Sequence, residues 1–255
     1  MKITLVQFSP VWKDPAANRE ILTRLFSQLP ATDLVVLPEM FSTGFVTEPA
    51  GVAETGGESL CFLQEMAAAH DCAVAGSVAT ETEGAYRNRF YFVFPDGREA
   101  HYDKHHLFTY GGEHRRYTPG DRPVTVEFRG VRILLQVCYD LRFPVFSRNR
   151  LCADGRALYD LALYVASWPQ PRVDAWDLLL RARAIENQCF VAGVNRVGDD
   201  PALHYCGHSA LIGPKGQLLT VCKENQEDVV TFDINLSELL AFRSQFPVLQ
   251  DADNQ

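Results

Sequence analysis

Short apolar runs recur along the whole chain, each too short to form a helix, and they constrain the fold more than any other feature of the sequence. Several of these runs are apolar at every position, which is typical of strands that are covered on both faces. The strands that they predict are Ile3–Phe8, Leu34–Leu37, Ala73–Val78, Phe90–Phe94, Val131–Val137, Leu161–Ala166, Phe190–Val194 and Val229–Phe232.

Helical patterns lie between the apolar runs. Asp14 followed by Pro15 predicts the start of a helix, because Asp caps helix N-termini and Pro suits the first turn, and apolar residues then recur on one helical face as far as Leu29. Further helices are predicted over Ser59–His70 and Asp174–Asn187. Strands that alternate with helices predict an α/β layered fold.

Turn sequences and the lack of a linker-like stretch indicate how the strands are connected and how many domains the chain forms. Pro95 to Gly97 and Gly213 to Gly216 are turn sequences between strand pairs, so we expect antiparallel hairpins and mixed sheets. Because no repeat or linker-like stretch divides the chain, we predict a single domain over residues 1–255. The polar tail from Phe246 to Gln255 is expected to reach a partner subunit or to fray.

Charge and composition exclude several classes of partner. The chain has 24 Lys and Arg against 32 Asp and Glu, a net charge of −8, which argues against binding nucleic acid or an anionic membrane. No apolar stretch is long enough to span a bilayer, and the Met1–Phe8 segment lacks the pattern of a signal peptide, so we expect a cytoplasmic protein. The seven cysteines, an odd number, favour reduced thiols over a disulfide framework.

Two ionisable residues stand where α/β folds gather functional groups, just past the carboxyl ends of strands. Glu39 follows the apolar run Leu34–Leu37, and Cys138 follows Val131–Val137. If these strands are neighbours, a carboxylate and a thiol share one cleft. The sharp turn indicated by Tyr139 to Pro144 would hold the thiol at an exposed position, as a nucleophile requires.

Other chemistries are open at this point. Any histidine could act as the base for a cysteine nucleophile, and the sequence positions none of His70, His101, His105, His106, His114, His204 and His208. Cys206 and His208 offer two zinc ligands, but no C-x-x-C or H-E-x-x-H motif accompanies them, so we predict no metal site. The glycine pairs lack the spacing of a phosphate loop or a dinucleotide fingerprint, so we predict no cofactor.

Three segments taken together resemble, in the same order, the Glu, Lys and Cys motifs of the nitrilase (carbon–nitrogen hydrolase) superfamily. They are Leu37–Phe41, Lys104–Phe108 and Val137–Pro144. The resemblance implies a four-layer α-β-β-α sandwich with two mixed sheets. It also implies that the chain associates into a homodimer or a higher homo-oligomer.

The resemblance further implies a Glu–Lys–Cys catalytic site that needs no metal. Glu39 would be the general base and Cys138 the nucleophile, while Lys104 and the backbone N–H of Tyr139 would stabilise the oxyanion. Glu113, between the Lys and Cys motifs, would orient Lys104 or the substrate.

The string from Cys138 to Pro144 resembles the omega-amidase branch of the superfamily, which implies a small amide substrate, 2-oxoglutaramate or 2-oxosuccinamate. Trp168 is expected to form a wall of the pocket. The remote carboxylate of such a substrate needs a cation, for which the candidates are Arg142, Arg115, Arg116 and Arg172.

Other functions within the same fold stay open. Thr109 and Val145 depart from the family pattern and leave the subfamily and substrate uncertain. The alternatives are another amidase, a nitrilase, a carbamoylase, or a catalytically silent binding or regulatory member.

Overall fold

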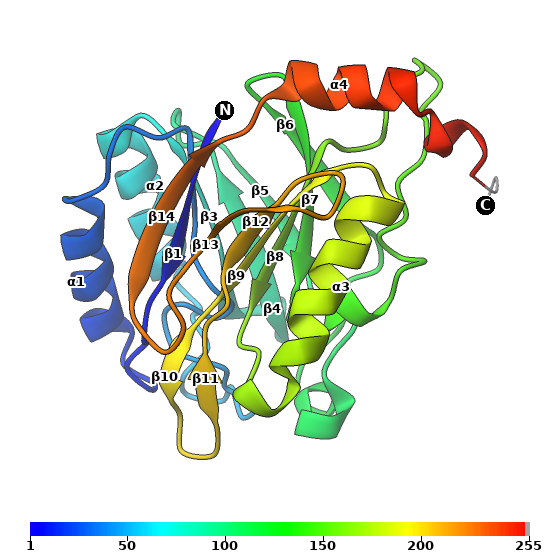
Figure 1. Cartoon of the computed structure of the whole chain (residues 1–255). Coiled ribbons are helices and arrows are strands. Elements are labelled where there is room, and N and C mark those ends of the chain that lie inside the picture. The colour runs from blue at the N-terminus through cyan, green and yellow to red at the C-terminus, as the bar shows by residue number, and fades with distance from the viewer. Residues whose placement is uncertain (253–255) are drawn as a thin grey trace.

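The computed structural model describes residues 1–252 and places two six-stranded sheets face to face between layers of helices (Figure 1). The first sheet has the order β14-β1-β2-β3-β4-β5 and the second the order β13-β12-β9-β8-β7-β6. The strands of the first sheet are β1 (Lys2–Gln7), β2 (Leu34–Val36), β3 (Ala73–Thr82), β4 (Ala85–Val93), β5 (Glu99–Asp103) and β14 (Asp228–Asp233). Those of the second are β6 (Val124–Phe128), β7 (Val131–Val137), β8 (Leu161–Ala166), β9 (Phe190–Asn195), β12 (Ala210–Ile212) and β13 (Leu218–Val221).

Both sheets are mixed, with parallel strands in the middle. β1, β2 and β3 pair in parallel, as do β7, β8 and β9, whereas the strands at the sheet edges pair antiparallel. Parallel neighbours need a crossover connection, which contains a helix between β1 and β2, between β2 and β3, and between β8 and β9. The connection from β7 to β8 is a short 3₁₀ turn and a loop. A separate two-stranded ribbon of β10 (Val197–Asp199) and β11 (His204–Cys206) projects from one end of the molecule (Figure 1).

Helices form the outer layers. α1 (Pro15–Phe26) and α2 (Glu58–His70) lie against the first sheet, and α3 (Val173–Glu186) lies against the second (Figure 1). α1 begins where the Asp14–Pro15 signal predicts, because the Asp14 carboxylate accepts a hydrogen bond from the backbone N–H of Ala17.

The alternation of side chains along each strand explains the continuous apolar runs. In β2, Leu34 and Val36 pack in the core between the two sheets, whereas Val35 packs with the residues under α1 and α2. Each face is therefore buried in a different apolar layer. Full burial of one such side chain stabilises the fold by roughly 1.5–3 kcal/mol.

The predicted fold class, with its two mixed sheets between helices, is confirmed. Both predicted hairpin turns join antiparallel strands, β4 to β5 and β12 to β13. The sequence prediction missed short strands such as β6 and β13, and it missed the helix α4 (Leu236–Gln245). In the polar tail, Leu249 is buried, so this part of the tail packs against the rest of the chain. Residues 253–255 of the tail lie outside the described residues.

The strands before Glu39 and Cys138 are not neighbours in one sheet, so the condition stated for a shared cleft is met in another way. β2 belongs to the first sheet and β7 to the second, so the two residues meet across the sandwich instead of along one sheet edge. The cleft between them is thus built by the packing of the sheets.

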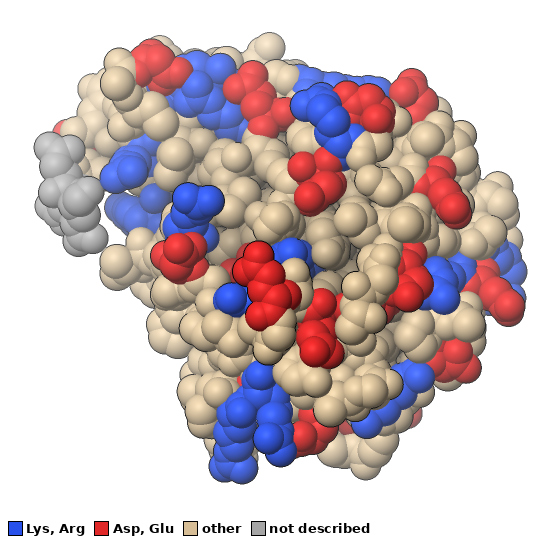
Figure 2. All heavy atoms as spheres, turned by 180° about the vertical axis from the view of Figure 1, so that it is seen from behind, with Lys and Arg blue, Asp and Glu red and all other residues tan. Residues whose placement is uncertain are grey.

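The surface is not dominated by charge of one sign on the face shown in Figure 2. Lys and Arg side chains lie there among Asp and Glu side chains, with uncharged residues between them. Within residues 1–252, no helix combines the length and apolar character needed to cross a membrane.

Candidate active site

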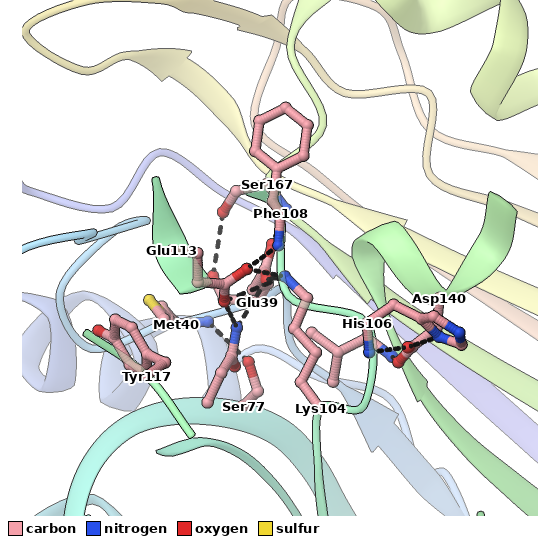
Figure 3. Close-up of polar contacts among 12 residues, drawn as sticks. Glu39, Met40, Ser77, Lys104, His106, Phe108, Glu113, Tyr117, Asp140 and Ser167 are labelled. Carbon is pink, nitrogen blue, oxygen red and sulfur yellow. Dashed lines mark hydrogen bonds and ion pairs between the residues drawn. The ribbon is translucent and has the colours of Figure 1, made fainter. Parts of the chain in front are cut away.

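Glu39 lies in the loop after β2 and is completely buried. The next residue, Met40, has a φ of 46°, a left-handed conformation that is held by a hydrogen bond from its backbone N–H to Ser77 Oγ on β3. This tight turn directs the Glu39 carboxylate toward the other sheet. There its Oε2 accepts a hydrogen bond of 2.8 Å from the backbone N–H of Ser167, the residue after β8 (Figure 3).

Lys104, the residue after β5, is buried between two carboxylates (Figure 3). Its Nζ lies 2.9 Å from Glu39 Oε1 and 2.9 Å from Glu113 Oε2. Glu113 is also fully buried, and its Oε2 accepts a hydrogen bond of 2.6 Å from the backbone N–H of Phe108. The structure therefore brings together Glu39, Lys104 and Glu113 as the sequence predicts.

The two carboxylates keep the Lys104 ammonium charged inside the protein. Burial alone would lower the pKa of Lys104, but the charges of Glu113 and Glu39 outweigh it and hold the pKa well above its usual range. Burial raises the pKa of Glu113, while Lys104 opposes that rise. Two carboxylates thus surround one ammonium.

Cys138 is the first residue of a short 3₁₀ helix, Cys138–Arg142, directly after β7. Its φ of 46° marks a strained turn, and its residue surface is only 9% exposed, so the expectation of an exposed thiol is wrong. The two sheets and the surrounding loops enclose the thiol on all but the pocket side. Burial raises the pKa of Cys138, the charge of Glu39 raises it further, and Lys104 lowers it.

The turn that carries Cys138 is held by Asp140. The Asp140 carboxylate accepts hydrogen bonds from the backbone N–H of Val137 at 3.0 Å and from Tyr102 Oη at 2.8 Å. It also accepts one from the backbone N–H of His106 and lies 2.8 Å from His106 Nδ1 (Figure 3). The ring of His105 stacks on Phe146, so the His105–His106 pair forms part of the scaffold around this turn.

A pocket opens beside Cys138. Tyr139, Arg142 and Trp168, the predicted substrate-binding residues, all contribute to its lining. The residues around it are Phe45, Phe108, Cys138, Tyr139, Arg142, Ser167, Trp168, Pro169, Arg172, Leu203 and Tyr205. Aromatic walls with a few polar groups are typical of small-molecule sites.

Two arginines give the pocket its positive charge. The guanidinium of Arg142 lies 4.9 Å from the centre of the Trp168 ring, and that of Arg172 lies 5.4 Å from the centre of the Phe108 ring. Across residues 1–252, neither guanidinium forms an ion pair with a carboxylate. The other two candidates are not among the lining residues, and Arg116 instead pairs with Glu48.

Sequence reasoning missed two residues that contact Glu39. Ser167 stands just past the carboxyl end of β8, so the rule that found Glu39 and Cys138 could have found it. Asn88 lies in the middle of β4, and its Nδ2 lies 2.8 Å from Glu39 Oε1 and 3.1 Å from Glu113 Oε1. Asn88 is flanked by Arg87 and Arg89 and precedes the predicted strand Phe90–Phe94, so no local signal marked it as buried.

Cys206 and His208 do gather with a third potential ligand, Glu224, with their ligand atoms within 4.8 Å of one another. The sequence could not pair Glu224 with them, because the chain between them forms the β12–β13 hairpin. His208 Nδ1 already lies 2.8 Å from Asp177, and Nε2 lies 3.8 Å from Glu224, whose side chain is 58% exposed. Two carboxylates thus flank the imidazole directly, which accounts for the cluster.

Comparison with known proteins places this site in a family. The family model described as carbon-nitrogen hydrolase matches residues 2–244. The chain belongs to the carbon–nitrogen hydrolase family. The predicted recognition of this superfamily and of a hydrolase that acts on carbon–nitrogen bonds is therefore confirmed.

Several carbon–nitrogen hydrolases are similar to this chain over nearly its whole length. It is 44% identical to "Omega-amidase YafV" of Escherichia coli (strain K12), over 99% of this chain and 97% of that protein. It is 34% identical to "2-oxoglutaramate amidase" of Bacillus subtilis (strain 168), over 98% of this chain and 96% of that protein. Among solved structures, XC1258 from Xanthomonas campestris, a CN-hydrolase superfamily protein, superposes with a TM-score of 0.97 at 46% identity, covering 100% of this chain and 98% of that one.

Proposed function

We propose that this carbon–nitrogen hydrolase is an omega-amidase, which hydrolyses the terminal amide of 2-oxoglutaramate or 2-oxosuccinamate to the 2-oxo dicarboxylate and ammonia. The observation that carries the proposal is the pocket beside Cys138, which presents two guanidinium groups without carboxylate partners among residues 1–252. A substrate with an amide at one end and a carboxylate at the other matches a thiol and a cation in one pocket. The relatives named for omega-amides support the same substrate class.

In the proposed first half-reaction, Cys138 attacks the amide carbon while Glu39 takes the thiol proton. The raised pKa of Cys138 means that the thiol is protonated at neutral pH, so a base must act during attack. The carbonyl π electrons move to oxygen and form a tetrahedral oxyanion. Collapse of this intermediate breaks the carbon–nitrogen bond, and the proton on Glu39 passes to the leaving nitrogen, which departs as ammonia.

Lys104 is suited to stabilise the oxyanion. An ammonium has three N–H donors, and Nζ lies 2.9 Å from Glu39 Oε1 and 2.9 and 3.2 Å from the two oxygens of Glu113. In the proposed reaction the two Glu113 oxygens share one N–H, and the third N–H turns to the substrate. Tyr139 follows Cys138 in the 3₁₀ helix, where helical geometry leaves a backbone N–H without an acceptor in the same helix. These two donors flank the thiol and form the proposed oxyanion hole.

In the second half-reaction, water replaces ammonia at the thioester. The water oxygen attacks the thioester carbon while Glu39 accepts a proton from that water. A second oxyanion then forms in the same oxyanion hole. Collapse breaks the carbon–sulfur bond, releases the acid and returns the proton to Cys138. Glu113 takes no proton in this scheme, since its contacts with Lys104 and the Phe108 N–H hold the ammonium in place.

The test measures ammonia release from 2-oxoglutaramate, glutamine and a simple aliphatic nitrile, by the wild type and by Cys138→Ala. We expect turnover of 2-oxoglutaramate alone and a loss of at least about a thousandfold in kcat for the variant, because the nucleophile is removed. Circular dichroism shows whether the variant is folded. Preferred hydrolysis of glutamine or of the nitrile would refute the omega-amidase, and full activity of the variant would refute the nucleophile.

A further inference from the structure

Asn88 contacts both carboxylates of the site. Its side chain lies on β4, is 1% exposed, and reaches Glu39 Oε1 and Glu113 Oε1 through the same nitrogen, Nδ2. An amide nitrogen carries two hydrogens, so each carboxylate receives one of them. Asn88 is therefore a neutral bridge between two groups of like charge.

The orientation of this amide is set by the carboxylates. With Nδ2 toward them, Asn88 Oδ1 is buried, and no donor in the described part of the chain pairs with it. The reverse orientation would place Oδ1 against two carboxylate oxygens, which repel it. The Asn88 side chain thus gives both N–H donors to the carboxylates while its Oδ1 acceptor has no partner. A buried acceptor without a partner is costly, which indicates that this position requires the two donors.

The backbone of Asn88 supports the same site. Its carbonyl oxygen accepts a hydrogen bond of 2.9 Å from the backbone N–H of Lys104, just beyond the last β4–β5 pair, Arg89 with Asp103. One residue therefore fixes the start of the Lys104 segment through its main chain and the two carboxylates through its side chain. Lys104 Nζ lies 2.9 Å from the same Glu39 oxygen and 3.2 Å from the same Glu113 oxygen, so Asn88 is a second donor to each of them.

We propose that Asn88 is a positioning residue that keeps Glu39 and Glu113 ionised and correctly placed around Lys104. The inference rests on the proposed roles of Glu39 and Cys138, but not on which amide is the substrate. Hydrogen bonds to a carboxylate favour its charged form, so the loss of both donors makes protonation of the pair easier. As the pH falls, the variant then loses the carboxylate that serves as base for the thiol at a higher pH than the wild type does.

Other titratable groups also face the carboxylates and are unchanged by a substitution at Asn88. They come from loops and strands on both sides of the site. They are Lys104, Cys138, Tyr117 and Tyr205.

The test follows the pH profile of Asn88→Ala by two readouts. With 2-oxoglutaramate, we expect kcat to fall about tenfold or more while KM stays within about twofold, because Asn88 does not line the pocket. The acid limb of kcat/KM should move up by about one pH unit. The second readout is the rate at which iodoacetamide alkylates Cys138, followed by mass spectrometry of its peptide, and its acid limb should move by the same amount.

Two further variants separate positioning from packing. Asn88→Ser keeps one donor in a smaller side chain, so its acid limb should lie between those of the wild type and Asn88→Ala. Asn149→Ala is the matched control, since Asn149 is also fully buried and donates through Nδ2 to the backbone oxygens of Tyr159 and Asn187, away from the carboxylates. This control should lose stability without any shift of the acid limb.

The outcomes keep this inference distinct from the proposed function. If the wild type hydrolyses no omega-amide, the substrate proposal fails, while the alkylation profile still tests Asn88. Equal acid limbs in folded Asn88→Ala and in the wild type would overturn the positioning role. If Asn88→Ala does not fold, an acid limb for Asn88→Ser that matches the wild type would overturn it as well.

Discussion

Lys104 and its neighbours show at the scale of single residues how a charged group is kept inside an apolar sandwich. A buried ammonium is costly unless it is paired, and Glu39 and Glu113 both lie 2.9 Å from Nζ. An arrangement of two carboxylates around one ammonium suits a site in which the thiol starts protonated. It also means that a substrate carboxylate must bind away from the cluster, where positive charge is available.

The two pocket arginines provide a prediction about specificity. We expect Arg172→Gln and Arg142→Gln each to raise KM for 2-oxoglutaramate about 10- to 100-fold, as loss of a hydrogen bond between charged groups does. KM for a short uncharged amide should change little. Arg116→Gln is the control, because Arg116 pairs with Glu48 on the surface. An equal rise in KM for both amides would assign the arginine to packing against Trp168 or Phe108 and not to carboxylate binding.

At the scale of elements, the 3₁₀ turn after β7 depends on a link to the segment after β5. Asp140 makes that link, since its carboxylate contacts Val137, Tyr102 and His106 at once. The strained φ of Cys138 persists because these contacts over-determine the turn. The positions of Cys138 and Lys104 are thereby coupled through one buried side chain.

Asp140→Asn tests this link. An amide has one acceptor oxygen and would turn its NH₂ toward N–H donors, so we expect a loss of about 2–4 kcal/mol in the free energy of unfolding. We also expect a fall in kcat, because the turn relaxes. Urea denaturation and ammonia release measure the two effects. The control is Asp96→Asn in the exposed β4–β5 hairpin, which should change neither the free energy of unfolding nor kcat. If Asp140→Asn also leaves both quantities unchanged, the turn holds without this carboxylate.

At the scale of the whole molecule, the sandwich buries several thiols, and their burial makes the stability of the fold depend on pH. Burial raises the pKa of Cys72 to about 11 and that of Cys222 to about 12, and it also raises that of Cys189. The pKa of a thiol in the unfolded chain is about 8.5. Between these values the unfolded chain has lost protons that the folded chain retains, so stability is full below about pH 8.5 and falls as the pH rises.

We therefore expect the free energy of unfolding to fall between pH 8 and pH 11, by about 3 kcal/mol for Cys72 alone. Urea denaturation under reducing conditions at several pH values measures this slope. Cys72→Ala should make the slope shallower, whereas Cys61→Ala should not, because Cys61 is exposed. A slope that does not depend on Cys72 would contradict the prediction.

Local patterns predicted most of the layers of this fold. The bounds of β7 and β8 are those of the apolar runs, and the capping sequence at Asp14 begins α1 as expected. α4 was missed although Asn235 caps it by accepting hydrogen bonds from the N–H groups of Ser237 and Glu238. Its exposed face is nearly as apolar as its buried one, so its periodicity is weak. β13, with four residues, is too short to show a period, whereas β6 does alternate apolar and polar residues and was overlooked.

By itself, the sequence determined the α/β class, because strand periodicity is a local property. The resemblance of three motifs to those of the carbon–nitrogen hydrolases implied Glu39, Lys104 and Cys138 as one set. Tertiary structure alone decided that Glu39 and Cys138 face each other from different sheets and that the thiol is buried. It also decided that Asn88 joins the two carboxylates. The first of these contacts depends on how the two sheets pack. The second depends on strand order within the first sheet, where Asn88 and Glu39, 49 positions apart in the chain, meet with no local signal to pair them.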